Sequence, residues 1–532
     1  MENRKLLYFV FTFGLVGGLI LRLLYASHLP LSNDEGSYLY DGLLLSQGKW
    51  PFLTSFSRAP ALMFLTAFVV KVFGRSFLAG RMISVLAGLG SAYFLYLIGR
   101  KLFNQRVGIA AFLLYALLAP CVVHTIYLHT QPLEMFFVLA GVWFVLRGLF
   151  EKPVGLRGFN PTGWIVAGVF FGLAVLVRET AALYPAAMVL AIFALSDGKS
   201  GNRSHKRLRE AVLMGASSLA VWGGVWGFIA SQVGFEKVKA VFLAITTMHD
   251  TGEYMSFGFT LRKKFEVFYG ALGENFILYT LAAIFAVILI SKLGGWVRQR
   301  RIRKGMEKNW IFLFLFCSVP VLFYGLYYRR LQAEYLAEFM PALVLMSAVA
   351  LDFCMRRSTP KQTLRVATGQ ALRNYNLFLL LPIGYCLFTN YRYQWFHQHG
   401  GTHAPEALKE AVSFVEDNVP SDEEIFTAAA VVPFLTGHDL ALDMSRPVIF
   451  GYPHLDPQIK DTLFPSDQEI ISHLETRPVN WAVFDRTTWE TFSRGHPEIE
   501  KYLKKNYNIV KTIPNERTGT LIEIAKKPIR AN

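Results

Sequence analysis

The start of the chain decides the fold, because it places the apolar run LLYFVFTFGLVGGLILRLLY (residues 6–25) just before the polar segment SNDEGSYLYD (residues 32–41). About 20 apolar residues are enough for a helix to cross a bilayer. Hydrophobic residues make up 53% and charged residues 17% of the 532-residue chain, whereas a soluble domain has roughly 45–50% and about 25%. We therefore expect a polytopic membrane protein and exclude an ordinary soluble enzyme or a disordered chain.

More apolar runs follow the first one, so we expect a mainly α fold with about eleven membrane-spanning helices. The runs lie near residues 6–25, 78–98, 107–127, 131–149, 163–177, 180–196, 211–232, 276–296, 310–328, 338–354 and 377–390. Basic residues gather in alternate loops, for example Arg100, Lys101 and Arg106 after the second run. Because positively charged loops stay in the cytoplasm, the pattern predicts a cytoplasmic N-terminus and an extracytoplasmic C-terminus.

The charge distribution divides the chain into two predicted domains. Residues 1–390 contain 39 Lys and Arg against 18 Asp and Glu, whereas residues 391–532 contain 15 against 20. Membrane topology explains the basic loops of the first part, so we expect no nucleic acid as a partner. The second part has helix-period stretches and strand-like runs, which predict a small extracytoplasmic α/β domain. The helical stretches are 406–418 and 467–475, and the strand-like runs are Ile425–Ala429, Asn480–Phe484 and Leu521–Ile524.

The first predicted outer loop, residues 26–77, holds the first candidates for chemistry. Asp34 and Glu35 come just after the first span, at the membrane surface. One interpretation is structural: Ser32 or Asn33 caps a helix, and acidic residues in a first turn are favoured by the helix dipole. The other interpretation is catalytic, since a carboxylate at this place can act as a general base towards an acceptor hydroxyl.

Further landmarks follow the acidic pair, and their order resembles a known family. The run Met63–Phe73 is too short to span and is expected to lie in the membrane interface. The landmarks, in chain order, are Asp34-Glu35, Gly48-Lys49-Trp50-Pro51, Arg58-Ala59-Pro60, Phe73-Gly74 and Arg81. Their arrangement resembles that of the GT-C membrane glycosyltransferases, in particular the protein-O-mannosyltransferase and lipid A aminoarabinose-transferase group. It departs from that pattern at Ala59 and Ile83, where the family often has proline.

The resemblance implies a GT-C-like fold and a reaction. The family transfers a sugar from a polyprenyl-monophosphate donor to an acceptor hydroxyl at the outer face, with inversion of the anomeric carbon. Asp34 would be the catalytic base, and Glu35 would orient the acceptor or bind a metal. The leaving phosphate needs cations, and a guanidinium fork matches its oxygens. The arginines expected to bind the donor phosphate are Arg58, Arg81, Arg178 and Arg330.

A second carboxylate is less clearly placed. The family often has an acid before the fourth span, where this chain has Gln131, and Glu134 follows three residues later. An acid inside a span is costly and tends to be functional, but Glu134 could equally pair with an arginine. Two of the arginines also have structural interpretations, since Arg178 could pair with Glu179 at a helical turn and Arg330 could belong to a headgroup-anchoring belt.

The expected partners are the polyprenyl-phosphate sugar, a lipid, glycan or protein acceptor, and membrane lipids. Metal dependence stays open: a divalent ion is compatible with the family, whereas the histidines 397, 399 and 403 are more typical of a solvated linker. We found no phosphate loop of the GxxxxGKS/T type and no HExxH motif. The alternatives are a multispan lipid or solute transporter or flippase, a non-catalytic assembly subunit, and a polymer ligase with a lipid-diphosphate donor.

Overall fold

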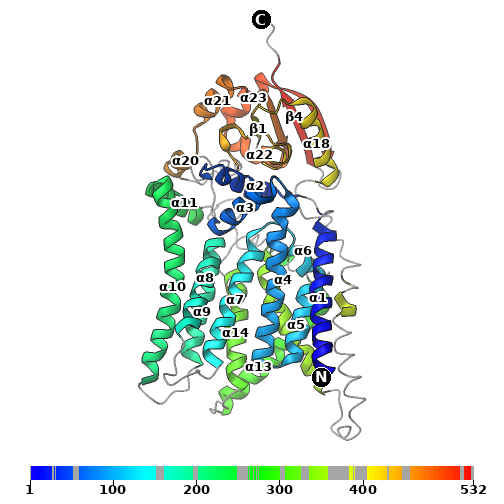
Figure 1. The fold of residues 1–532 in the computed structure, drawn as a ribbon, viewed down its shortest axis with the longest axis vertical. Coiled ribbons are helices and arrows are strands. Elements are labelled where there is room, and N and C mark those ends of the chain that lie inside the picture. Colours follow the sequence, from blue (N-terminus) through cyan, green and yellow to red (C-terminus); the bar gives the residue numbers. More distant parts are fainter. Residues whose placement is uncertain are drawn as a thin grey trace.

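The computed structural model describes most of the chain. The described residues are 2–26, 29, 31–51, 59–150, 161–195, 202–247, 306–324, 335–357, 404–427, 430–445, 456–515 and 520–528, with parts of 262–299 and 383–389. They form a helical bundle, two short helices across one end of it, and a smaller unit with a β-sheet at the same end (Figure 1). The chain is therefore mainly helical with a small sheet, as the sequence predicts.

The bundle contains the helices that the apolar runs predict. Its elements are α1 (Glu2–Ala26), α4 (Phe77–Leu102), α5 (Gln105–Leu117), α6 (Ala119–His124), α7 (Thr130–Phe150), α8 (Pro161–Val177), η2 (Glu179–Ala182), α9 (Leu183–Ala194), α10 (Asn202–Val233), α13 (Phe276–Gln299), α14 (Met306–Leu322) and α15 (Leu336–Arg357). Among the described residues, five helical stretches are long and apolar enough to cross a membrane, namely Leu7–Ala26, Phe77–Leu102, Thr130–Phe150, His205–Val233 and Leu336–Met355. The chain is thus a membrane protein. The count of about eleven spans stays a prediction, and the last predicted run, 377–390, lies mostly outside the described residues.

One apolar run is interrupted where we expected a single helix. The run 107–127 is divided into α5 and α6 at Leu118, whose backbone is extended (φ −69°, ψ 129°). Pro120 in the first turn of α6 explains the break, because a proline has no backbone N–H and fits only at the start of a helix. The interruption lets the chain turn towards the segment 125–129, which contributes to the site described below.

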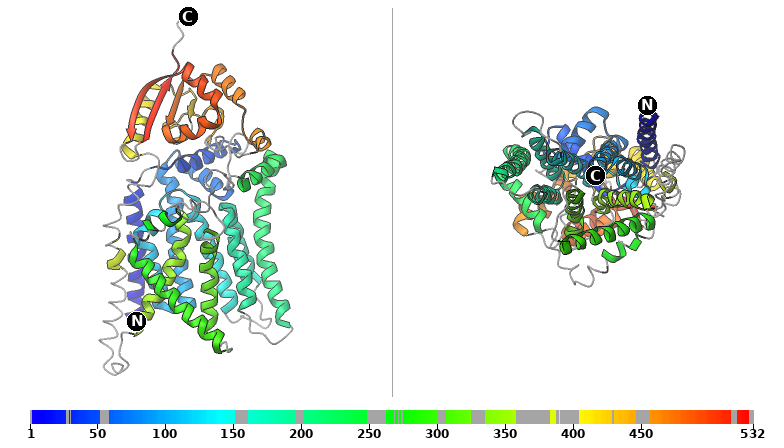
Figure 2. Two further views of the ribbon diagram at one scale, coloured as in Figure 1. Left: turned by 180° about the vertical axis from the view of Figure 1, so that it is seen from behind. Right: turned by 90° about the horizontal axis from the view of Figure 1, so that it is seen from below.

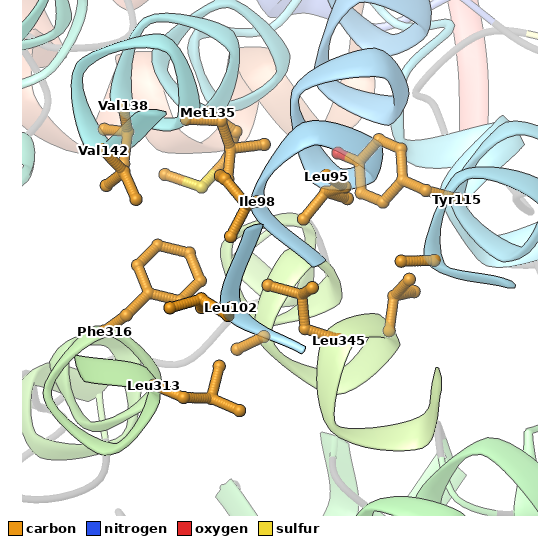
Figure 3. Close-up of a cluster of buried hydrophobic side chains, with 14 of the residues drawn as sticks. Leu95, Ile98, Leu102, Tyr115, Met135, Val138, Val142, Leu313, Phe316 and Leu345 are labelled. Atoms are coloured by element: carbon orange, nitrogen blue, oxygen red, sulfur yellow. The ribbon is translucent and has the colours of Figure 1, made fainter. Parts of the chain in front are cut away.

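The core of the bundle lies between α4, α5, α7, α14 and α15 (Figure 3). Leucine, isoleucine and valine side chains from these helices interdigitate, and the aromatic rings of Tyr115 and Phe316 complete the packing. Close helix approach elsewhere depends on glycine: a Cβ atom at Gly88 of α4 would lie 2.6 Å from Cβ of Thr125. The packing fixes α4 and the 125–129 segment relative to each other.

Two helices, α2 (Asn33–Ser46) and α3 (Pro60–Phe73), lie across the end of the bundle that is remote from the start of α1 (Figure 1). α3 corresponds to the predicted interfacial run and begins with Pro60 in its first turn. α11 (Phe235–Thr247) lies at the same end, beside α20 (Pro457–Leu463) of the smaller unit (Figure 1). α2 and α3 thus lie between the bundle and the smaller unit.

The smaller unit, residues 404–528, has a four-stranded mixed sheet of order β1-β2-β4-β3. β1 (Ile425–Thr427) and β2 (Trp481–Asp485) are parallel, while β4 (Thr520–Lys526) is antiparallel to β2 and to β3 (Asn508–Asn515). The structure confirms the three predicted strands. β3 was not predicted, because its first five residues are exposed or half-buried and lack a clear alternation.

Helices of the smaller unit cover the sheet (Figure 2). They are α18 (Pro405–Asn418), α19 (Val431–Thr436), η7 (Ala441–Asp443), α20 (Pro457–Leu463), α21 (Asp467–Thr476), α22 (Arg486–Gly495) and α23 (Pro497–Asn506). The predicted helices at 406–418 and 467–475 coincide with α18 and α21. The predicted domain boundary at residue 390 falls outside the described residues and stays a prediction.

Candidate active site

The candidate site is built around the N-terminus of α2, where the two predicted acids have different environments. Ser32 caps the helix: its Oγ accepts a hydrogen bond from the Asp34 N–H, and the Glu35 carboxylate accepts one from the Ser32 N–H at 3.1 Å. This reciprocal arrangement is a capping box. Asp34 is exposed, whereas the Glu35 side chain is completely buried. The structure therefore confirms that Ser32 caps this helix. The Asp34 carboxylate beside it is exposed.

Glu35 forms a buried ion pair with Arg81 of α4. Nε and Nη2 of Arg81 each lie 2.8 Å from a different oxygen of Glu35, and the backbone N–H of Leu128 donates to Oε1 at 3.0 Å. Burial alone would raise the pKa of the Glu35 carboxyl, but the Arg81 guanidinium and the Leu128 hydrogen bond hold this pKa below its usual value. Glu35 thus remains a carboxylate and joins α2 to α4 and to the segment after α6.

Arg81 has further bonds that tie down the connection before α2. Its Nη1 donates to the carbonyl oxygen of Ala26 at 2.6 Å and to that of Leu29 at 3.4 Å. The guanidinium also lies over the ring of Tyr127, 5.2 Å from its centroid. Because the side chain of Arg81 is only 2% exposed, these contacts favour a positioning role over the predicted role in phosphate binding, which stays a prediction.

The two residues before the exposed Asp34, Ser32 and Asn33, each contact a polar side chain from another part of the chain. Nε2 of His129 lies 3.3 Å from Oγ of Ser32, and Nδ2 of Asn33 lies 3.4 Å from Oδ2 of Asp485. Asp485 is the last residue of β2 and is 1% exposed. The N-terminus of α2 therefore lies at the junction of the bundle, the 125–129 segment and the smaller unit.

A second buried cluster of charges surrounds Arg178, which has an extended backbone between α8 and η2. Its Nη1 lies 3.0 Å from Oε1 of Glu338 on α15, and its guanidinium lies 4.6 Å from the ring centroid of Tyr335. The Tyr324 hydroxyl donates to the same Glu338 oxygen at 2.6 Å. Among the described residues, no acceptor is aligned for a hydrogen bond with Nη1 of Arg178. The pairing with Glu338 is thus a charge contact between two buried groups.

Glu134 of α7 faces the same cluster. Its Oε1 accepts a hydrogen bond from the Thr180 hydroxyl at 3.4 Å, and its Oε2 is buried with no hydrogen-bond partner among the described residues. Glu134 lies close enough to interact with Arg178 and Glu338. Buried charges cost free energy unless they are paired, so the two carboxylates and the single guanidinium form an electrostatically connected group.

The structure brings together some of the predicted residues, and others lie outside the described residues. Asp34, Glu35 and Arg81 lie at one junction, and Glu134 lies with Arg178. Arg58 and Arg330 lie outside the described residues, as do the three histidines 397, 399 and 403. Within the part of the chain that the structure describes, no group of three or more His, Cys, Asp or Glu could hold a metal.

Two acidic residues of the site, Glu338 and Asp485, were not found from the sequence. Glu338 carries a usable signal, because it is an acid at the start of an apolar run, where acids are costly and tend to be functional. Asp485 carries no such signal in the sequence, because it ends an ordinary buried strand. Its contact with Asn33 joins two residues that are 452 positions apart.

Comparisons with known proteins match part of the chain to a family. Residues 57–226 match the family model of the dolichyl-phosphate-mannose-protein mannosyltransferases. No curated protein sequence matches the chain. The matched region begins in the α2–α3 connection and ends within α10, so it includes Arg81, Glu134 and Arg178 but not Asp34 or Glu35.

Solved structures have the same fold over almost the whole chain. The structure of ArnT from Cupriavidus metallidurans bound to undecaprenyl phosphate aligns with a TM-score of 0.64 and 15% identity, covering 96% of this chain and 97% of that one. The Archaeoglobus fulgidus oligosaccharyltransferase AglB, in complex with an inhibitory peptide and a dolichol-phosphate, aligns with a TM-score of 0.53 and 13% identity, covering 96% and 74%.

The family match and the shared fold agree with the resemblance carried by the first outer loop. The chain has the fold of these two solved structures over almost its whole length, and residues 57–226 match the mannosyltransferase family model.

Proposed function

We propose that the protein transfers a sugar from a polyprenyl-monophosphate donor to an acceptor hydroxyl at the outer face of the membrane, with Asp34 as the general base. The observation that carries the proposal is the contrast at the start of α2, where Asp34 is exposed while Glu35 is buried against Arg81. The neighbours ArnT and AglB, solved with undecaprenyl phosphate and dolichol-phosphate respectively, support the class of donor.

The proposed chemistry is a single displacement. The Asp34 carboxylate takes the proton of the acceptor hydroxyl while its oxygen forms a bond to the anomeric carbon. The bond from that carbon to the phosphate oxygen breaks at the same time, and the polyprenyl phosphate leaves with the electron pair. Attack from the side opposite the leaving group inverts the anomeric centre. No acid is needed, because the phosphate is already a stable anion.

The developing charge on the phosphate requires a cation, and Arg178 is our choice among the described arginines. Its guanidinium is nearly buried, and it belongs to a group with two carboxylates, Glu338 and Glu134, and only one described cation. Preorganised charge is most effective in a site from which water is excluded. Arg58 and Arg330 remain candidates from the sequence. We assign Glu35 and Arg81 to positioning, since each satisfies the other's charge.

The experiment measures sugar transfer in native membranes that contain the protein, with radiolabelled polyprenyl-monophosphate hexoses and a pentose as donors. We expect wild type to label a new product, and Asp34→Asn to lose about 100-fold or more of the rate because a general base contributes 10²–10⁴-fold. Asp422→Asn is the matched control, since Asp422 is also exposed but lies in the smaller unit. Full activity of Asp34→Asn would overturn the assignment of the base.

The same experiment separates the proposal from its alternatives. A transporter or flippase would leave all labelled donors unconverted, and the acid-to-amide change would then block export of the lipid or solute. A polymer ligase would transfer label only from a lipid-diphosphate donor, so one such donor belongs in the panel. An assembly subunit would tolerate Asp34→Asn but not loss of its C-terminal part.

A further inference from the structure

We propose that a short segment of the smaller unit, Leu440–Ser445, positions α2 and with it the Asp34 carboxylate. We call this segment the clip. The inference rests on the proposed function, because it concerns where the base is held. It assigns the smaller unit a role in catalysis that does not depend on contact with the substrate.

The clip binds α2 through three buried hydrogen bonds along the helix. The backbone N–H of Leu440 donates to the Tyr40 hydroxyl at 2.7 Å. The Ser37 hydroxyl donates to the carbonyl oxygen of Ser445 at 2.9 Å, and the Ser445 hydroxyl donates to Oδ1 of Asp41 at 2.5 Å. All five residues are at most 6% exposed. Buried polar groups are costly to leave unpaired. These bonds therefore fix the rotation of α2 about its axis and its position along that axis.

The end of α2 is attached to the clip as well. Nζ of Lys49, three residues beyond the last residue of α2, lies 2.9 Å from Oδ2 of Asp443. This ion pair is partly exposed, so it contributes little energy by itself. It does, however, extend the contact along the whole of α2.

The backbone of the clip is strained where it makes these contacts. Leu442 and Asp443 both have positive φ angles, 57° and 54°, and they are the only described residues other than glycine that do. Such conformations cost of order 1–3 kcal/mol each and persist only when surrounding contacts impose them. The strain therefore lies at the segment that binds α2.

The first turn of α2 also touches the smaller unit directly. A Cβ atom at Gly36 would lie 2.4 Å from Cγ2 of Val431 and 2.9 Å from its backbone nitrogen. The contact is thus possible only because residue 36 is glycine. On its other side this turn is held by the Glu35–Arg81 pair, so the turn that carries Asp34 is fixed from both the bundle and the smaller unit.

The test compares variants of the clip with a matched control at another contact of the same unit. Ser445→Ala removes only the hydroxyl bonded to Asp41, and Ser445→Thr retains a hydroxyl. Arg75→Gln is the control, because the hydrogen bonds of Arg75 join the α3–α4 turn to the carbonyl oxygens of Pro433 and His438, and none of them goes to α2. Turnover and the donor KM are measured with the donor that wild type uses, and amide hydrogen exchange of residues 33–46 is measured without any donor.

We expect Ser445→Ala to lower kcat about tenfold with a nearly unchanged donor KM, since small displacements of a catalytic group cost up to about 100-fold. Ser445→Thr should recover most of this loss, and exchange in α2 should rise only in Ser445→Ala. Unchanged kcat and exchange in Ser445→Ala would overturn the proposal, as would an equal loss in Arg75→Gln. Failure of the proposed function is a different result, namely full activity of Asp34→Asn.

Discussion

The pair Glu35–Arg81 allows the sharpest test of how the site is built, because the sequence predicts that Arg81 binds the donor phosphate and that Glu35 orients the acceptor or binds a metal. We expect Glu35→Gln to destabilise the protein by about 3–5 kcal/mol, the cost of leaving a buried charge without its partner. The structure supports the upper part of this range, since Glu35 is fully buried and Arg81 is 2% exposed on its side chain. Two contacts of 2.8 Å are lost or weakened together.

A double-mutant cycle separates positioning from catalysis. Removing both charges in Glu35→Gln/Arg81→Met should cost less than the sum of the single changes, because no buried charge is left unpaired. The coupling free energy should lie in the range of about 0.5–3 kcal/mol found for residues in contact. The assay is the thermal unfolding midpoint of the detergent-solubilised protein, measured together with kcat.

Two results would refute this reasoning. The first is a cycle in which the single changes add, which would mean that the pair is not coupled in solution. The second is a Glu35→Gln variant with wild-type stability and no turnover, which is the behaviour of a group that acts on the substrate. Asp34→Asn is the matched control in both measurements, since an exposed carboxylate should change kcat and leave the unfolding midpoint in place.

The remaining predictions concern α2 and the phosphate. Gly36→Ala should lower both kcat and stability, by about 1–3 kcal/mol for overpacking, since the new Cβ would clash with Val431; its unfolding midpoint and turnover test this. Lowering the pH should detach α2: the pKa of Glu35 is held below its ordinary value, so its stabilisation is present above that value and is lost as the pH falls through the folded pKa. Amide exchange of α2 should then rise in acid, but not in the double variant. Arg178→Lys should raise the donor KM, because a lysine lacks the guanidinium fork, and unchanged donor kinetics would exclude Arg178 from phosphate binding.

The sequence predicted those parts of the molecule that depend on local pattern. Apolar runs of adequate length became helices, and Ser32 or Asn33 as a cap, followed by acidic residues, marked the start of α2. The broken run at Leu118 shows the limit of this approach, because hydropathy alone does not respond to Pro120. The clip could not be predicted from the sequence for a different reason. Its hydrogen bonds join residues about 400 positions apart.

The roles of Asp34 and Glu35 could not be separated from the sequence, and the geometry of a helix explains why. Successive residues of an α-helix point about 100° apart, so adjacent acids face different surroundings. The sequence treats them as one acidic pair, but α2 lies between the bundle and the smaller unit, and rotation about its axis decides which acid is buried. The ion pair with Arg81 directs the Glu35 side chain towards the bundle. The clip binds Tyr40 and Asp41 further along α2. With these positions fixed, Asp34 is the exposed carboxylate at the start of α2, and our proposal that it acts as a base therefore predicts that both attachments of α2 are needed for activity.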